Sequence, residues 1–236
     1  IENKIKKTIT YDKYIDNKET LSEIIHSKQA NQTDILKIYL AVFKKYKIEH
    51  NVVFTSNRYK IQFDKEFESF ENLSELLFYF PSIKKYLTPT EIEYRIPLFP
   101  ATLANNNGLF IKEKTFAGVK MGIGEINFIE IPGSDVTHDI MDITVDFTKD
   151  LENPLITSKI SFGGYSALNF QAIKDFASAE QYKTVLKSIA ENYTVETEYK
   201  TLNTENDGTE FIGKKPFVLN VAFDGKDLTK KAGENY

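Results

Sequence analysis

The stretch from Thr33 to Tyr46 constrains the fold more than any other part of the chain. Its apolar residues recur at intervals of three and four: Ile35, Ile38, Tyr39, Val42, Phe43 and Tyr46. That spacing places them on one side of an α-helix, and the breadth of this apolar side predicts a largely buried helix. The pair Thr33-Asp34 puts a polar cap and an early acid at the positive end of the helix dipole, which marks the start.

Patterns on either side of this helix predict an α+β arrangement. Thr20-Leu-Ser-Glu23 is a capping box that begins a helix upstream. Residues 7–14, 48–56 and 59–63 are expected as strands. Residues 75–80 alternate between two sets of side chains that are both largely apolar, which is typical of a strand buried on both sides.

The second half of the chain favours strands with one helical segment. Prolines and the run Asn105-Asn-Asn-Gly108 predict irregular structure over 81–108, so we place a domain boundary at 108, between domains 1–108 and 109–236. Strand patterns then recur around a helical insertion at about 166–191, which contains a capping box, Ser178-Ala-Glu-Gln181. These intervals predict an antiparallel β-sandwich that carries a helical insertion.

Composition excludes several classes of function. The chain has no cysteine, which rules out thiolate catalysis, disulfides, iron–sulfur clusters and thiolate zinc sites within it. A net charge of −4 does not favour a nucleic-acid partner, which would need a clustered basic face. No stretch approaches the roughly 20 apolar residues of a membrane span. Because the first residue is Ile1, we expect a fragment or a processed product of a longer protein.

Residues capable of acid–base or metal chemistry form no supported constellation. The three histidines are scattered without ligand spacing: His26, His50 and His138. Three acids at spacing two would share one face of a strand and suit a hard cation such as calcium: Asp64, Glu66 and Glu68. We expect a solvated face there instead, beside a buried one, and predict no catalytic residue, no metal and no cofactor.

One resemblance adds to this interpretation. The residues from Asn31 to Ile48 resemble the nucleophile helix of bacterial transglutaminase-like proteins, whose motif is Cys-Lys-Asp followed by an apolar helix and Gly-Ile. Asp34 matches the motif aspartate, and Ile48 follows it by fourteen residues, as the pattern requires. The cysteine position falls on Gln32.

The family's other two motifs are Asn-His at a strand start and Leu-Asp-Pro-Thr about fifteen residues later. The chain has Asn72-Leu73 and then Leu87-Thr88-Pro89-Thr90. The resemblance therefore puts the histidine position on Leu73 and the aspartate position on Thr88. Further phrases resemble one extracytoplasmic branch of the family and lie at 54–58, 77–81, 107–111, 137–139 and 162–165.

The resemblance covers about residues 15–200 and implies part of a papain-like transglutaminase core followed by a β domain. In this branch another β domain of unknown function precedes the core, and we expect it in the full-length protein. The branch is exported, which implies a periplasmic or outer-surface location. Glutamine, leucine and threonine cannot replace the thiolate, the proton carrier and the orienting acid of a papain-like mechanism.

Three functions follow as hypotheses. The first is a catalytically inactive module that binds or scaffolds a peptide, a glycan or a protein in the cell envelope, with Gln32, Asn72 and Thr88 as neutral hydrogen-bonding groups near Asp34 and Leu73. The second is a hydrolase of another mechanism, with a serine beside an acid. Its candidate nucleophiles are Ser56, Ser69 and Ser74. The third is a structural role in an assembly, in which sheet edges recruit a partner strand.

Overall fold

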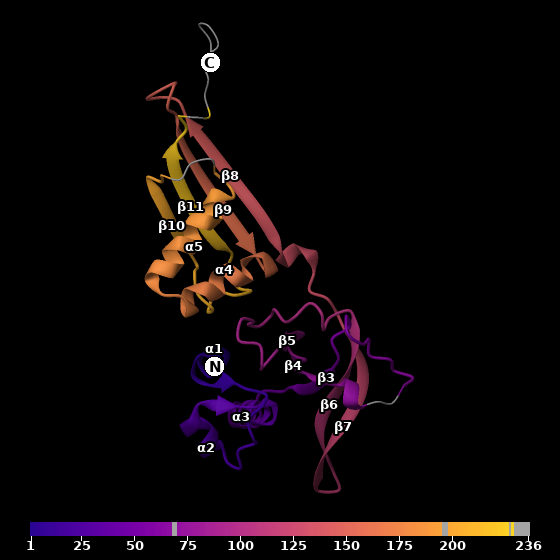
Figure 1. Cartoon of the computed structure of the whole chain (residues 1–236). Coiled ribbons are helices and arrows are strands. Elements are labelled where there is room, and N and C mark those ends of the chain that lie inside the picture. Colours follow the sequence, from indigo (N-terminus) through magenta and orange to yellow (C-terminus); the bar gives the residue numbers. More distant parts are fainter. Residues whose placement is uncertain (68–69, 195–197, 227, 229–236) are drawn as a thin grey trace. The chain divides into compact units, whose positions relative to one another are not determined.

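The computed structural model describes residues 1–67, 70–194, 198–226 and 228, and it has a mixed α/β fold with antiparallel sheets and five α-helices (Figure 1). It divides into two compact units, residues 1–132 and 133–236. The division lies later than the boundary expected at 108. Residue 108 is inside a strand, β6 (Asn106–Phe116), which continues the sheet of the first unit.

Three α-helices belong to the first unit: α1 (Glu2–Thr8), α2 (Leu21–Ser27) and α3 (Gln32–Tyr46). The capping box of α2 is confirmed, because Thr20 and Glu23 each accept a hydrogen bond from the other's backbone N–H. The buried helix is confirmed as α3. Its cap is Asn31, two residues before the expected start, and the Asn31 side chain accepts from the Asp34 N–H at 3.1 Å.

The main sheet of the first unit has the order β5-β4-β3-β6-β7 and is antiparallel throughout. Besides β6, its strands are β3 (Asn51–Thr55), β4 (Glu75–Phe80), β5 (Lys85–Leu87) and β7 (Val119–Ile129). The strand expected over 7–14 is wrong: this region forms the end of α1 and the two-residue β1 (Thr10–Tyr11), which pairs with β2 (Gln29–Ala30). The strand expected over 59–63 is also wrong, since those residues form turns and loop.

Two layers cover β4, which is therefore buried on both faces as predicted. On one face, α3 packs Ile35, Tyr39 and Phe43 against Phe78 and Phe80 of β4. On the other face, the irregular segment before β6 packs its side chains against Leu77 of the same strand and against its neighbours. The members of this second cluster include Val53, Tyr86, Phe99, Leu103 and Phe110.

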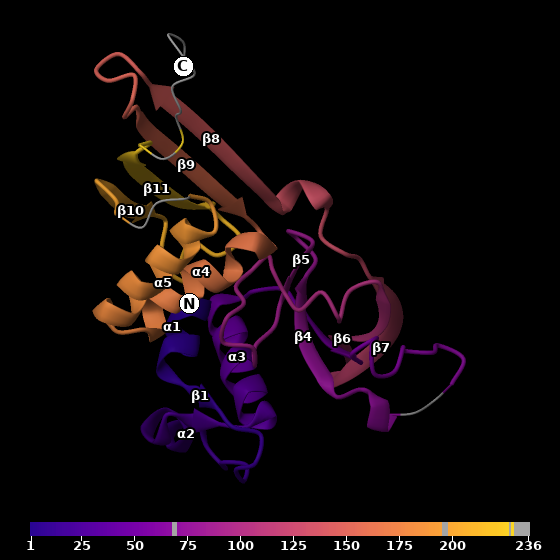
Figure 2. The same ribbon diagram turned by 45° about the horizontal axis from the view of Figure 1, so that its top comes forward.

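The second unit holds one antiparallel sheet of order β10-β11-β9-β8 in its described part. Its elements are β8 (His138–Asp146), β9 (Leu155–Gly163), α4 (Tyr165–Phe176), α5 (Ala179–Glu191), β10 (Thr201–Glu205) and β11 (Phe217–Asp224). The two helices confirm the expected helical insertion. Figure 2 shows them on one face of the sheet, where Tyr182, Leu186 and Ile189 of α5 join a core with Phe162 and Phe217. The sequence pattern also predicts a strand over 193–199, of which residues 195–197 lie outside the described residues.

Candidate functional site

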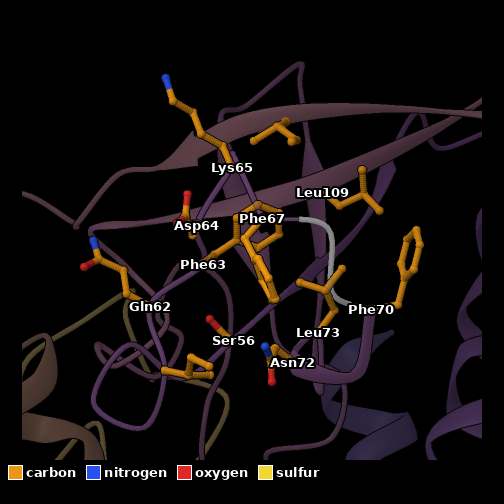
Figure 3. Close-up of a pocket in the computed structure, with 12 residues that line it drawn as sticks. Ser56, Gln62, Phe63, Asp64, Lys65, Phe67, Phe70, Asn72, Leu73 and Leu109 are labelled. Atoms are coloured by element: carbon orange, nitrogen blue, oxygen red, sulfur yellow. The ribbon is translucent and has the colours of Figure 1, made fainter.

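A pocket of about 500 Å³ opens in the first unit beside the main sheet (Figure 3). One wall is the segment from Ile61 to Lys65 together with Phe67, which follows β3. A second wall is Asn72-Leu73, at the end of the short 3₁₀ helix η1 (Phe70–Asn72) and just before β4. Leu109 of β6 and Ile126 of β7, which are cross-strand partners, complete the lining.

The aromatic residues of this pocket are poorly covered by the rest of the unit. Phe67 is 67% exposed and Phe70 is 79% exposed, while Phe63 is partly buried. In Figure 3 the rings of Phe63 and Phe67 occupy the middle of the lining set, and the ammonium group of Lys65 points away from them. Apolar surface of this kind, gathered in a concavity with a few polar groups, is typical of a ligand site.

Two asparagines at the start of β6 fix one wall of the pocket. The fully buried Asn106 donates to the Ser56 carbonyl at 2.9 Å and accepts from the Phe63 N–H at 3.0 Å. Asn107 donates to the Phe63 carbonyl at 3.2 Å, and Thr55 donates to the Asn107 carbonyl at 2.7 Å. The segment that begins at Ser56 is therefore held at both ends by side-chain amides. The run 105–108, expected to be irregular, supplies this clamp.

Gln32 and Leu73, two of the three family positions, are brought close together. Gln32 is the first residue of α3, and its Nε2 donates to the Ser74 carbonyl at 3.1 Å. Ser74 directly follows Leu73, which lines the pocket with Asn72. Leu73 itself precedes β4 and does not lie on a strand. The helix start thus touches the segment that forms one wall of the pocket.

Thr88 lies elsewhere along the sheet and is not among the lining residues of the pocket. It directly follows β5 and is almost completely buried. Leu87 of β5 pairs with Phe78 of β4, so the next residue, Thr88, lies opposite Leu77 in the antiparallel register. Leu77 is four residues further along the chain than Leu73. The register therefore separates the expected aspartate position from the expected histidine position.

Asp34, the remaining candidate, makes contacts that stabilise the fold. Its carboxylate is fully buried, and each oxygen accepts from the Lys18 N–H at 3.1 Å. Lys37 pairs with it at 3.2 Å. Because the carboxylate sits in the first turn of α3, it also complements the helix dipole. These bonds tie the chain before α2 to the start of α3.

The serines of the hydrolase hypothesis have different surroundings. Ser56 is buried in the pocket lining, and its hydroxyl accepts from the Asn106 amide at 3.2 Å, a donor that cannot remove a proton. The exposed Ser74 hydroxyl donates to the Glu75 carboxylate at 3.4 Å, which is a long contact. Ser69 lies outside the described residues. No histidine is among the residues that line the pocket.

Glu75, Glu91 and Glu93 form an acidic group at the start of β4 that the sequence did not predict. Burial raises the pKa of Glu91, and the negative charges of Glu93 and Glu75 raise it further. Burial likewise raises the pKa of Tyr11, and the negative charge of Glu91 raises it further. Glu75 follows Ser74 directly, so this group adjoins the contact with Gln32. The alternating pattern over 75–80 marked the strand start, but only the folded chain brings Glu91 to it.

The shared acidic face considered for a cation is not formed. The Asp64 carboxylate accepts from the Glu66 N–H at 2.9 Å, which is a turn and not a strand, and Glu68 lies outside the described residues. Across the part of the chain that the structure describes, no group of three or more histidine, aspartate or glutamate side chains is arranged to hold a metal. The described helices also include none that is long and apolar enough to cross a bilayer.

The arrangement as a whole provides an apolar concavity whose polar lining residues are the neutral Ser56, Gln62 and Asn72 and the charged Asp64 and Lys65. Such a site can hold an apolar group of a ligand and hydrogen-bond to the ligand's amides on either side of that group. Comparisons with protein-family models, with curated proteins and with solved structures each return no match for this chain.

Proposed function

We propose that the chain is a non-catalytic binding module of transglutaminase-like origin, and that its first unit binds a peptide through an apolar side chain. The observation that carries the proposal is the pocket beside Leu73, with Phe67 and Phe70 left largely exposed. Its volume of about 500 Å³ falls inside the range of roughly 300–1,000 Å³ found for small-ligand sites. One or two apolar side chains would fill it.

The residues at the three family positions support binding without turnover. The chain has no thiol, and Gln32 uses its amide to hold the Ser74 carbonyl. Thr88 is buried, and neither it nor Leu73 can move a proton at neutral pH. The proposal retains the location in the cell envelope that the resemblance implies and the sandwich-like second domain that the strand intervals predict.

A peptide suits this pocket because the lining combines apolar side chains with side-chain amides that can bind a peptide backbone. The apolar lining desolvates a side chain, while the amides of Gln62 and Asn72 offer both donors and acceptors to a peptide backbone. A glycan would instead place hydroxyl groups against Leu73, Leu109 and Ile126, where they would lose hydrogen bonds to water. Affinity for an apolar peptide should therefore exceed affinity for a sugar.

Isothermal titration with the blocked tripeptides Ac-Ala-Phe-Ala-NH₂ and Ac-Ala-Ser-Ala-NH₂ tests the proposal. Burial of the phenylalanine ring is worth about 1.5–3 kcal/mol, so the Phe peptide should bind at least about tenfold more tightly. Phe67→Ser combined with Phe70→Ser should remove that preference. Phe116→Ser is the matched control, because Phe116 is similarly exposed in the same unit but does not line the pocket.

Several results would contradict the proposal. Equal affinity for the two peptides, or an unchanged preference in the double variant, would show that the pocket is not the binding site. Tighter binding of an envelope glycan than of the Phe peptide would assign the site to a sugar. Cleavage of either peptide during the titration would favour the hydrolase hypothesis, for which Ser74 beside Glu75 is the pair to mutate first.

A further inference from the structure

Strand β8 is one of the two edges of the sheet in the second unit. It pairs with β9 on one side only, and no other described strand pairs with it. Figures 1 and 2 show it at the outer margin of the sheet, beyond α4 and α5. Because backbone N–H and C=O groups of alternate residues point to opposite sides of a strand, about half of those in β8 face outward without a ladder partner.

From Met141 onward, the side chains of β8 are apolar on the face that the helices cover elsewhere. Its register pairs Met141 with Ile160 and Val145 with Ile156, and both isoleucines are buried in the core beneath α4 and α5. Met141 is nevertheless 46% exposed, Ile143 54% and Val145 43%. They border a groove of about 450 Å³ whose other side includes the residues that follow α5. An added strand would cover them and extend the core.

The charges of β8 restrict what can bind there. The strand contains Asp139, Asp142 and Asp146 and no basic residue other than a terminal histidine. A second copy of the chain would therefore set two groups of three aspartates along one junction, and like charges facing each other across strands are destabilising. The present neighbour of β8 shows part of the complementary pattern, since Lys159 of β9 lies opposite Asp142 and the next residue, Ile160, lies opposite Met141 on the other face.

We infer that the edge of β8 binds an extended segment of another protein in which apolar residues alternate with lysine or arginine. The backbone of that segment would pair with the outward N–H and C=O groups of β8. Its apolar side chains would cover Met141, Ile143 and Val145, and its basic side chains would approach Asp142 and Asp146 on the opposite face. This is strand addition to a sheet edge, and it is independent of the pocket in the first unit.

The test is an NMR titration of the ¹⁵N-labelled full chain with a nine-residue peptide that alternates Ile and Lys. Matched peptides carry Glu in place of Lys, or the original sequence with every backbone amide N-methylated. We expect saturable shifts confined to the amides of β8 and its neighbours, at least tenfold tighter binding of the Lys peptide than of the Glu peptide, and no binding of the methylated peptide. Asp142→Lys should abolish the preference, whereas Glu180→Lys on α5 should preserve it.

Other results would overturn the inference. Equal binding of the Lys and Glu peptides, shifts mainly outside β8 and its neighbours, or no saturable binding would each show that the edge does not recruit a basic strand. Retained binding of the N-methylated peptide would exclude backbone pairing. Concentration-dependent broadening of the β8 amides without any peptide would assign the edge to a second copy of the chain.

Discussion

Removal of the Asn106 side chain should loosen the pocket wall and destabilise the first unit. In Asn106→Ala, the Ser56 carbonyl and the Phe63 N–H both lose their side-chain partner. The same substitution removes bonds to the Ser56 hydroxyl at 3.2 Å and from the Asn107 N–H at 3.0 Å. Asn106 is fully buried, so water does not readily replace it.

The expected magnitude follows mainly from the two loop groups that lose their partner, the Ser56 carbonyl and the Phe63 N–H. Leaving one buried polar group unsatisfied costs about 1–3 kcal/mol. Water has partial access near Phe63, which reduces the cost for the Phe63 N–H. We therefore expect the free energy of unfolding to fall by about 2–4 kcal/mol in total. Asn106→Asp keeps the acceptor for Phe63 but loses the donor to Ser56. Burial raises the pKa of the new carboxyl, so this variant should regain stability relative to Asn106→Ala as the pH falls and the carboxyl becomes a donor.

Hydrogen exchange measured by mass spectrometry is the appropriate assay, because it reports the opening of each unit separately. Peptides that span β6 should exchange faster in Asn106→Ala, and peptides from β9 should not change. Asn127→Ala is the matched control, since Asn127 is exposed on the neighbouring strand, and it should change stability by less than about 0.5 kcal/mol. A loss below about 0.5 kcal/mol in Asn106→Ala would refute the clamp.

Three further predictions concern stability in urea followed by circular dichroism. Asn31→Ala should cost about 1–2 kcal/mol and Thr33→Ala much less, because Asn31 is the cap of α3; the reverse order would contradict the assignment. Glu91→Gln should be more stable than wild type at pH 7, and this advantage should shrink as the pH falls from 7 toward 4.5, because the raised pKa of Glu91 makes its ionised form costly in the folded state; an advantage that stays constant over this range would contradict the reasoning. Burial lowers the pKa of Lys6 to about 8, so wild type should gain stability relative to Lys6→Met between pH 7 and 10; a constant difference would contradict this.

The sequence predicted the elements whose own residues carry a complete pattern. Helix α3 and strand β4 follow from apolar periodicity, and α2 and α5 follow from capping boxes that the structure confirms. Helix α1 was missed because its seven residues lack a broad apolar face. Contacts distant in sequence hold it instead, as when Lys6 donates to the Tyr94 carbonyl at 2.8 Å.

The site was less predictable because its parts are distant along the chain. Asn106 and Asn107 have the composition of a loop, and only the fold shows their amides bound to the segment at Phe63. Gln32 at the start of α3 bonds to Ser74 beside Leu73, whereas the pairing of β4 with β5 sets Thr88 apart from Leu73. The exposed phenylalanines form a pocket only because β6 and β7 supply the opposite wall.

Methyl NMR of the full chain with Ac-Ala-Phe-Ala-NH₂ tests the central claim most directly. The methyl groups of Ile61, Leu73, Leu109 and Ile126 line the pocket and report on its occupancy. The account predicts saturable shifts at these methyls, contacts from them to the peptide ring, and a peptide that is intact at the end of the titration. Saturation with shifts only at other methyls, or no shift at all, would contradict the claim that this pocket is the binding site.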